Sequence, residues 1–176
     1  RNPVKVLRNY YQDGATTLAF GKPSIPLPLG RTVGGTTTIN SGTCFRPPEH
    51  VLDQWEKEGI RLDRTQLEAC FSRVEERLNV QSVPEHLLGG SSSVIARGAE
   101  VLGLEHGPLQ RNIRGCQQGA VCAFGCPNNA KQSTNLTYVP WALEAGARLF
   151  AGTTATGLLR NGHRVGGVVG RNKSGH

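Results

Sequence analysis

A glycine- and threonine-rich segment is the first part of the sequence whose residue types suit ligand binding. It runs Gly30-Arg-Thr-Val-Gly-Gly-Thr-Thr-Thr-Ile-Asn40. Paired glycines let backbone N–H groups approach a ligand that a side chain would block, while the threonine hydroxyls add donors and Arg31 adds a cation. This chemistry suits a pyrophosphate or the polar edge of a heteroaromatic ring, although an ordinary turn has the same composition. The strand–GxGxxG–helix fingerprint of dinucleotide binding does not occur in the chain.

A loop with three cysteines is the second segment that could do chemistry. Cys116, Cys122 and Cys126 have the spacing C-x5-C-x3-C, and Pro127 follows directly. Clustered thiolates with glycine between them and a trailing proline are typical of iron–sulfur ligation, and three cysteines suffice for a three-iron cluster. A zinc site would need a fourth ligand, and His106 does not have a standard zinc spacing. Unliganded thiols in a structural loop, or a labile disulfide, are alternatives that the spacing leaves open.

Composition and charge weigh against several other functions. The 176 residues carry a net charge of +7, but the basic residues are scattered singly and only 6% of the chain is aromatic. This pattern favours a small anionic ligand over a nucleic acid. No stretch approaches the roughly 20 apolar residues of a membrane-spanning helix. The five histidines are not paired with a Ser or Cys motif, and no isolated acidic pair marks a hydrolase.

Periodicity and turn residues predict a mixture of helices and strands. Leu67, Phe71, Val74 and Leu78 form one apolar stripe, and Asp63 or Thr65 can cap the helix that carries it. Asn161-Gly162 predicts a two-residue hairpin turn. Residues 1–29 read as irregular and 104–136 as mostly loop. We predict helices at 50–58, 63 or 65 to 78, 91–102 and 138–145, and strands between 148 and 170.

Two of these segments together resemble the glucose–methanol–choline (GMC) family of FAD-dependent oxidoreductases. Residues 30–40, with Pro47 and Asp53 downstream, resemble the family's first signature, although Cys44 replaces its usual aromatic residue or alanine. The run Gly125-Cys-Pro-Asn-Asn-Ala-Lys-Gln-Ser133, with Thr137-Tyr138-x-Pro140 and Ala145-Gly-Ala-Arg-Leu149 after it, resembles the long-chain-alcohol and sterol oxidase-like branch. The resemblance covers about residues 20 to 170.

The resemblance implies a fold and a place within a longer protein. We expect residues 1–176 to form a partial FAD-binding, Rossmann-like α/β domain with short helices and a C-terminal β-hairpin or meander. The GxGxxG unit and the substrate domain with its catalytic histidine would lie outside this segment, which is then truncated at both ends. We therefore expect the segment alone to bind FAD poorly and to oxidise no alcohol.

The resemblance also implies site residues and a reaction. The parent protein would oxidise an alcohol by hydride transfer to flavin N5, without a catalytic residue from this segment. Gly34, Gly35, Asn40, Gly42 and Thr43 would lie along the flavin and its ribityl-diphosphate, and the backbone of Ala155 would contact the adenine. The complete set of cofactor-binding residues that the resemblance implies would be Gly30, Arg31, Val33, Gly34, Gly35, Thr36, Asn40, Gly42, Thr43 and Ala155.

The cysteine loop leaves the electron acceptor open. Oxygen, a quinone or a haem protein could accept the electrons. Related FAD-dependent sugar dehydrogenases carry a three-iron cluster on three cysteines in this part of the chain, so Cys116, Cys122 and Cys126 could pass electrons to a haem or quinone. Two further classes are a non-enzymatic iron–sulfur carrier and a binding module in which neither segment acts.

Overall fold

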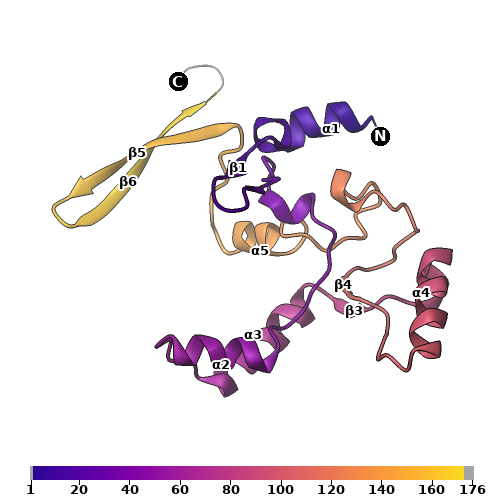
Figure 1. The fold of residues 1–176 in the computed structure, drawn as a ribbon. Coiled ribbons are helices and arrows are strands. Elements are labelled where there is room, and N and C mark those ends of the chain that lie inside the picture. The colour runs from indigo at the N-terminus through magenta and orange to yellow at the C-terminus, as the bar shows by residue number, and fades with distance from the viewer. Residues whose placement is uncertain (1, 173–176) are drawn as a thin grey trace. The chain divides into compact units, whose positions relative to one another are not determined.

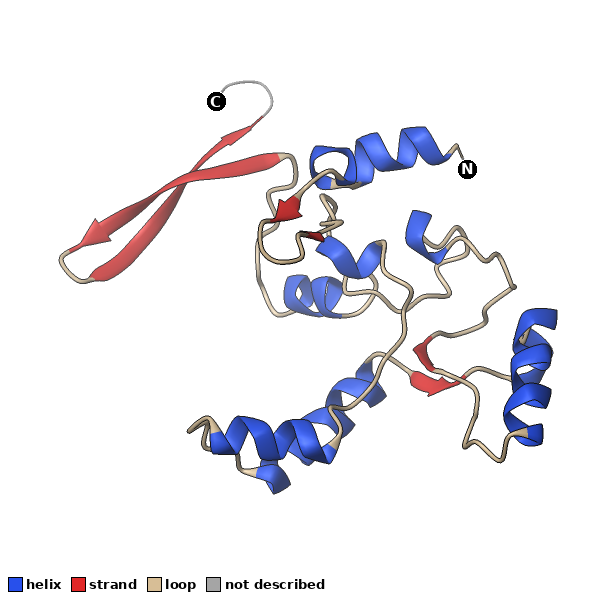
Figure 2. Ribbon diagram, in the orientation of Figure 1, coloured by secondary structure: helices blue, strands red, loops and turns tan. Residues whose placement is uncertain are grey.

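The computed structural model describes residues 2–172, and the chain divides into two compact units, Arg1–Pro140 and Trp141–His176. Figures 1 and 2 show short helices joined by long loops in the first unit and a long β-hairpin in the second. The helices are α1 (Pro3–Tyr10), η1 (Gln12–Ala15), η2 (Gly35–Thr38), α2 (Glu49–Lys57), α3 (Arg64–Arg77), η3 (Glu85–Leu87), α4 (Gly90–Val101), η4 (Cys122–Phe124) and α5 (Tyr138–Glu144), where η denotes a 3-10 helix.

The first helix lies in a segment for which the sequence predicted irregular structure, and that prediction is wrong. Asn2 caps α1, because its side-chain oxygen accepts hydrogen bonds from the backbone N–H of Val4 (3.0 Å) and Lys5 (3.3 Å). Pro3 occupies the first helical position, where its missing N–H costs nothing. These two residues are a recognised start signal, so α1 was readable from the sequence.

The helices α2 to α5 agree with the predictions to within one or two residues, whereas the four 3-10 helices were not predicted. In α3 the cap is Asp63, whose carboxylate accepts a hydrogen bond from the backbone N–H of Gln66 at 2.9 Å. The alternative cap at Thr65 is therefore excluded. Gly103 and Gly146, which follow α4 and α5, both adopt positive φ angles, as expected for glycines that end helices. Within residues 2–172, no helix has both the length and the apolar character needed to cross a bilayer.

The strands form three small antiparallel sheets. Their pairs are β1 (Leu18–Ala19) with β2 (Ile25–Pro26), β3 (Val80–Ser82) with β4 (Gln110–Asn112), and β5 (Thr153–Asn161) with β6 (Arg164–Asn172). In the hairpin β5–β6, Asn161 pairs with Arg164, so the two-residue loop is Gly162-His163. The predicted hairpin is confirmed, but its turn lies one residue later in the sequence than predicted. The described residues confirm a mixed helix-and-sheet fold, whereas the Rossmann-like assignment stays a prediction.

The buried core of the first unit lies beside the glycine segment. Val6 and Tyr11 from the N-terminal region pack with Ile39, and Phe124 of η4 packs against this cluster. The Tyr11 hydroxyl donates a 2.5 Å hydrogen bond to the backbone oxygen of Ala123. Burial raises the pKa of Tyr11, so the phenol keeps its proton and remains a donor. Segments 2–15, 30–40 and 122–126 are therefore held together around one apolar cluster.

Candidate functional site

The glycine segment forms a tight turn whose hydroxyl groups stabilise its own backbone. Gly34 (φ 88°) caps the helix η2, and Gly35 (φ 57°) begins it. The Thr37 hydroxyl donates to the carbonyl of Gly34 at 2.6 Å, and the Thr36 hydroxyl accepts from the N–H of Gly30 at 3.0 Å. The composition of the segment suggested that these hydroxyls are ligand donors. In the structure their hydrogen bonds hold the turn, so their main contribution is to fix the backbone conformation.

The space around the two adjacent glycines differs sharply. A Cβ atom on Gly34 would lie 2.8 Å from the backbone nitrogen of Asn135, so a larger residue there collides with the neighbouring segment. A Cβ atom on Gly35 would meet no heavy atom within 4 Å. Gly34 is therefore required by packing, whereas the surface at Gly35 faces open space. Since L-residues also disfavour the positive φ of both positions, glycine fits the backbone at each.

The second family-like run, residues 125–140, lies directly against this turn. The backbone N–H of Thr134 donates to the Thr37 hydroxyl at 3.1 Å, and the Thr134 hydroxyl donates to the Gly34 carbonyl at 3.0 Å. Two motifs about 100 residues apart in the sequence thus share one hydrogen-bond network. Their order along the chain does not by itself indicate this contact.

The Thr37 hydroxyl is at the centre of this network, and removing it tests how much the network stabilises the fold. We expect Thr37→Val to destabilise the full-length protein by about 1 to 2 kcal/mol, because the Gly34 carbonyl and the Thr134 N–H lose a partner in a half-buried place. Thr36→Val, which removes only the contact to Gly30, is the matched comparison and should cost less. Urea unfolding midpoints measure both changes, and equal midpoints for the two variants would contradict the network's importance.

Lys131 joins the glycine segment to the cysteine loop. Its side chain is only 1% exposed, and its ammonium group donates to the carbonyl of Asn40 (2.6 Å) and the carbonyl of Cys122 (3.0 Å). A third, longer contact of 3.3 Å reaches the Asn40 side-chain oxygen. Burial lowers the pKa of Lys131 to about 8, so the amine is still largely charged at pH 7. This lysine stands in the family-like run, but its role was not predicted from the sequence.

A small cavity of about 220 Å³ opens beside these residues. Of the predicted cofactor-binding residues, Val33 lines it, and the buried Ile39 and Lys131 contribute further wall. The remaining lining residues are Tyr10, Thr32, Thr38, Gly125, Cys126, Asn129, Ser133, Asn135 and Leu136. The cavity thus lies where the two family-like runs meet.

Gly42 and Thr43 lie against β4. A Cβ atom on Gly42 (φ 75°) would come within 2.7 Å of the Asn112 side-chain oxygen, so the chain approaches closely there. Thr43 pairs with Arg111 in an isolated bridge. Asn112 is 5% exposed, and its side-chain oxygen has no hydrogen-bond partner. A buried acceptor without a donor is costly, so this position is suited to a ligand hydroxyl or N–H.

The remaining predicted residues have separate places. The backbone N–H of Arg31 donates to the carbonyl of Tyr10 at 2.7 Å, while the Arg31 side chain is exposed. Asn40 accepts from the N–H of Gly42 at 3.1 Å, which closes the turn between them. Ala155 lies on β5 opposite Gly170, in the second unit, and its proposed adenine contact stays a prediction.

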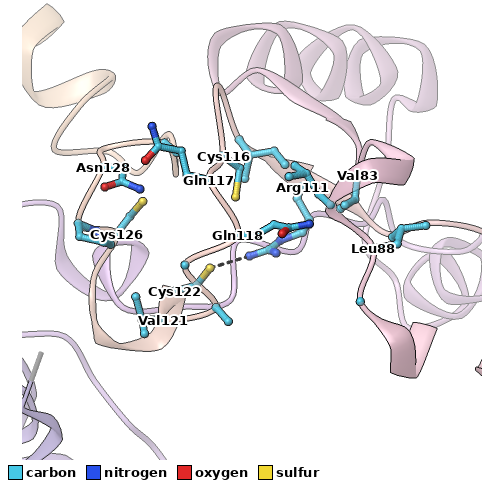
Figure 3. Close-up of a pocket in the computed structure, with 17 residues that line it drawn as sticks. Val83, Leu88, Arg111, Cys116, Gln117, Gln118, Val121, Cys122, Cys126 and Asn128 are labelled. Carbon is cyan, nitrogen blue, oxygen red and sulfur yellow. Dashed lines mark hydrogen bonds between the residues drawn. The ribbon is translucent and has the colours of Figure 1, made fainter. Parts of the chain in front are cut away.

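The three cysteines of the loop line a larger cavity of about 430 Å³ (Figure 3). They are not arranged around a shared ligand position, and the Cys122 sulfur accepts a 3.0 Å hydrogen bond from the Arg111 guanidinium. Within the described part of the chain, no group of histidine, cysteine or acidic side chains is placed to hold a metal. The metal assignment of Cys116, Cys122 and Cys126 is therefore not supported.

The alternative disulfide is not formed either, since all five cysteines are free. The loop backbone explains why the predicted iron–sulfur cluster has no site. Gln118 and Ala120 both adopt positive φ angles and turn the chain between Cys116 and Cys122. Cys-x5-Cys-x3-Cys spacing brings the residues into one loop, but it does not decide where each sulfur is directed.

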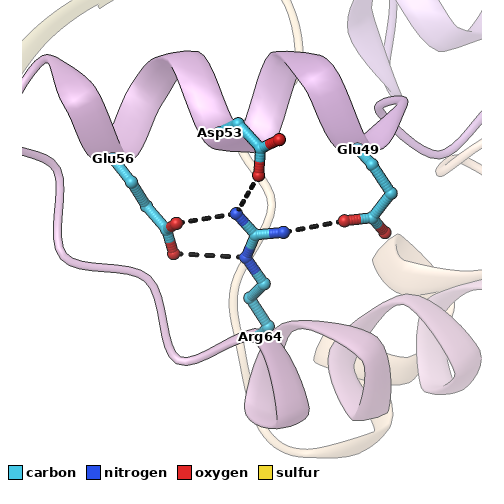
Figure 4. A network of polar contacts seen from close by, with 4 residues as sticks. All are labelled: Glu49, Asp53, Glu56 and Arg64. Carbon is cyan, nitrogen blue, oxygen red and sulfur yellow. Dashed lines mark hydrogen bonds and ion pairs between the residues drawn. The ribbon is translucent and has the colours of Figure 1, made fainter.

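Asp53, part of the signature-like pattern, belongs to an ion-pair network rather than to a cavity. Figure 4 shows the Arg64 guanidinium at the start of α3 facing three acidic side chains of α2. Its distances are 2.6 Å to Asp53, 2.7 Å to Glu49 and 2.7 Å to Glu56. Hydrogen bonds from Arg64 lower the pKa of Asp53 and of Glu56. The network links the start of α3 to one face of α2.

We expect Arg64→Gln to raise the pKa of Asp53 and of Glu56 toward their ordinary values, as measured by carboxyl chemical shifts during an NMR pH titration. In the native protein the two pKa values lie below those of the unfolded chain. Their stabilising contribution is therefore complete above about pH 4.5 and declines as the pH falls through the lowered values. Arg61→Gln is the charge-matched control, and equal pKa values in both variants would contradict this role of Arg64.

Comparisons with known proteins cover both family-like runs, residues 30–40 and 125–140. Residues 7–176 match the profile of the family described as GMC oxidoreductase. An uncharacterized GMC-type oxidoreductase of Mycobacterium tuberculosis (strain ATCC 25618 / H37Rv) is 38% identical over 176 residues, which cover 99% of this chain and 28% of that protein. A GMC-type oxidoreductase of Sinorhizobium fredii is 37% identical over 147 residues, or 81% of this chain and 28% of its own length.

More distant relatives have a named activity. A long-chain-alcohol oxidase of Arabidopsis thaliana is 30% identical over 154 residues, which cover 85% of this chain and 20% of the oxidase. No solved structure matches the chain. The chain spans less than a third of the length of these relatives. Because the family profile covers nearly all of it, the chain belongs to the GMC oxidoreductase family.

Proposed function

We propose that this chain is part of the FAD-binding domain of a protein that oxidises an alcohol at its CH–OH carbon. Family membership makes an oxidoreductase the first expectation, and the relatives named long-chain-alcohol oxidases suggest the substrate class. The observation that carries the proposal is the glycine turn: Gly35 faces open space on a backbone that hydrogen bonds from Thr37 and Thr134 hold rigidly.

The residues of the turn fit an FAD cofactor in two respects. A flat ring system needs a surface without side chains, which Gly35 offers. FAD also carries hydroxyl and N–H donors, and the buried oxygen of Asn112 beside Gly42 is an acceptor without a donor. We propose that Gly34, Gly35, Asn40, Gly42 and Thr43 line the flavin and ribityl-diphosphate, with Gly30, Arg31, Val33 and Thr36 supporting them and Ala155 at the adenine.

The chemistry would be divided between the cofactor and the protein. FAD supplies the two-electron acceptor when it is bound. This chain's contribution is orientation: the Thr37–Thr134 contacts fix the turn, and Lys131 holds the Asn40 carbonyl from the buried side. The proton of the substrate hydroxyl would be taken by a residue outside this chain. A Rossmann-like sheet around the cofactor belongs to the same proposal.

The test uses the full-length protein that contains this segment. We expect the purified protein to be yellow and to carry FAD, and an anaerobic addition of a long-chain primary alcohol to bleach its visible absorbance. Readmitting oxygen, or adding a quinone or a ferric haem protein under argon, then identifies the electron acceptor by the return of colour. A colourless protein that takes up no FAD would refute the cofactor assignment, and a yellow protein that no alcohol bleaches would refute the substrate class.

A further inference from the structure

The larger cavity, of about 430 Å³, is built by two parts of the chain that a side chain joins. One part is residues 83–89, and the other is residues 111–130. The side-chain amide of Gln118 donates a hydrogen bond to the backbone carbonyl of His86, which holds the two parts together. The volume is in the range of small-molecule sites. The cavity is therefore a built feature of the fold and large enough for a small organic ligand.

Arg111 is the cation among the described residues that line this cavity, and it has no acidic partner there. Its guanidinium donates through Nη2 to the Ser41 carbonyl and to the Cys122 sulfur. Its Nε is buried without a hydrogen-bond acceptor, and no carboxylate of the described residues forms an ion pair with it. By contrast, Arg46 and Arg64 each pair with two or more carboxylates. A half-buried charge without a counter-ion is costly, and an anion in the cavity would reduce that cost.

The rest of the cavity wall is uncharged and largely aliphatic. None of the described residues that line it is Asp or Glu, and the sequence from 106 to 143 contains neither residue type. The side chains of Val83, Leu88 and Val121 line the cavity together with Arg111 (Figure 3). One cation in an otherwise apolar wall fits a ligand that has a single negative charge and a hydrocarbon body.

We propose that this cavity binds a small aliphatic monocarboxylate whose carboxylate pairs with Arg111. The guanidinium donates charge-assisted hydrogen bonds to the carboxylate, and burial of the hydrocarbon body against the aliphatic wall adds to the affinity. Inorganic phosphate fits less well, because phosphate sites usually offer convergent backbone N–H groups or several cations. The inference does not rest on the proposed flavin chemistry, since none of the residues proposed to bind FAD lines this cavity.

The test is a calorimetric titration of the full-length protein with sodium hexanoate at pH 7. We expect saturable binding to one site. Hexylammonium, which has a similar hydrocarbon chain and the opposite charge, and inorganic phosphate, which has no hydrocarbon, should each bind about tenfold more weakly or not at all. A lack of saturable hexanoate binding, or equal affinity for hexanoate and hexylammonium, would overturn the proposal. Phosphate binding as tight as that of hexanoate would overturn the ligand class.

A matched pair of glutamine variants locates the site. Gln117→Glu adds a negative charge to the cavity wall, whereas Gln66→Glu adds the same charge to the exposed surface of α3. We expect Gln117→Glu to lose about tenfold in hexanoate affinity, because the new carboxylate repels the ligand, and Gln66→Glu to match the unmodified protein. Arg111→Gln should lose at least as much. Equal hexanoate affinity in the two glutamate variants would place the ligand elsewhere and refute the proposal, and this pair decides the question if Arg111→Gln does not fold.

Discussion

Lys131→Met is expected to destabilise the full-length protein by about 2 kcal/mol and to reduce the amount of flavin that it retains. Methionine fills nearly the same volume but cannot donate, so the Asn40 carbonyl loses a charge-assisted hydrogen bond of 2.6 Å. The turn from Asn40 to Gly42, which is proposed to line the cofactor, then loses its link to the cysteine loop. Urea unfolding gives the stability, and the ratio of visible to protein absorbance gives the flavin content.

Lys5→Met, on the exposed side of α1, is the control for the lost charge. It should change neither quantity measurably, because surface charges contribute little on their own. If Lys131→Met were as stable as the control, the buried ammonium would be a cost that its hydrogen bonds merely offset. If stability fell but flavin content did not, Lys131 would support the fold alone.

Lys131 also illustrates why the site was only partly predictable. Its place in a family-like run was visible in the sequence, but its burial depends on Asn40, 91 residues away, and on Cys122. The glycine pair is different, because the need for positive φ is a property of the residue itself and of its neighbours. Local requirements can be read from a sequence, whereas a buried lysine is explained only once the fold brings its acceptors to it.

The same distinction applies to the fold. The helices α2 to α5 carry local periodicity, caps or stops, and all four were predicted. α1 was missed despite the Asn2 cap, because the many prolines and glycines of residues 1–29 suggested irregular structure throughout. The hairpin turn was displaced by one residue because Asn161-Gly162 is a favoured pair, while in the structure only Gly162 adopts a positive φ.

The cysteine loop shows the limit of spacing as an argument. Three thiols within eleven residues suggested a shared ligand, but two non-glycine residues with positive φ redirect the backbone between them. Arg111, on β4, then takes the Cys122 sulfur as a hydrogen-bond acceptor. Neither the positive φ angles nor the hydrogen bond from Arg111 can be predicted from the local sequence. What the loop provides is a cavity lined by Cys116, Cys122 and Cys126 without a shared metal position in the described part of the chain.

Gly35→Ala is expected to fold with a small loss of stability and to lose flavin affinity on the order of a hundredfold. Its methyl group meets nothing in this chain, so the cost to folding is the left-handed backbone alone, about 1 kcal/mol. If the flavin lies against this surface, the same methyl displaces it by more than an ångström, and misplacement of that size has large effects on binding and rate. Equilibrium dialysis against FAD and urea unfolding measure the two quantities separately.

Gly34→Ala is the matched variant, with the opposite expectation. Its Cβ atom would lie 2.8 Å from the Asn135 nitrogen, so we expect a loss of about 2 to 4 kcal/mol in stability from strain and displacement of the neighbouring run. Gly35→Asn adds a side chain that tolerates positive φ, which keeps the fold and still blocks the surface. If Gly35→Asn and Gly35→Ala both bound FAD as the unmodified protein does, the open face of the turn would not be the flavin-binding surface. Adjacent glycines would then both serve the turn, and Gly42 beside Asn112 would remain as the contact to examine.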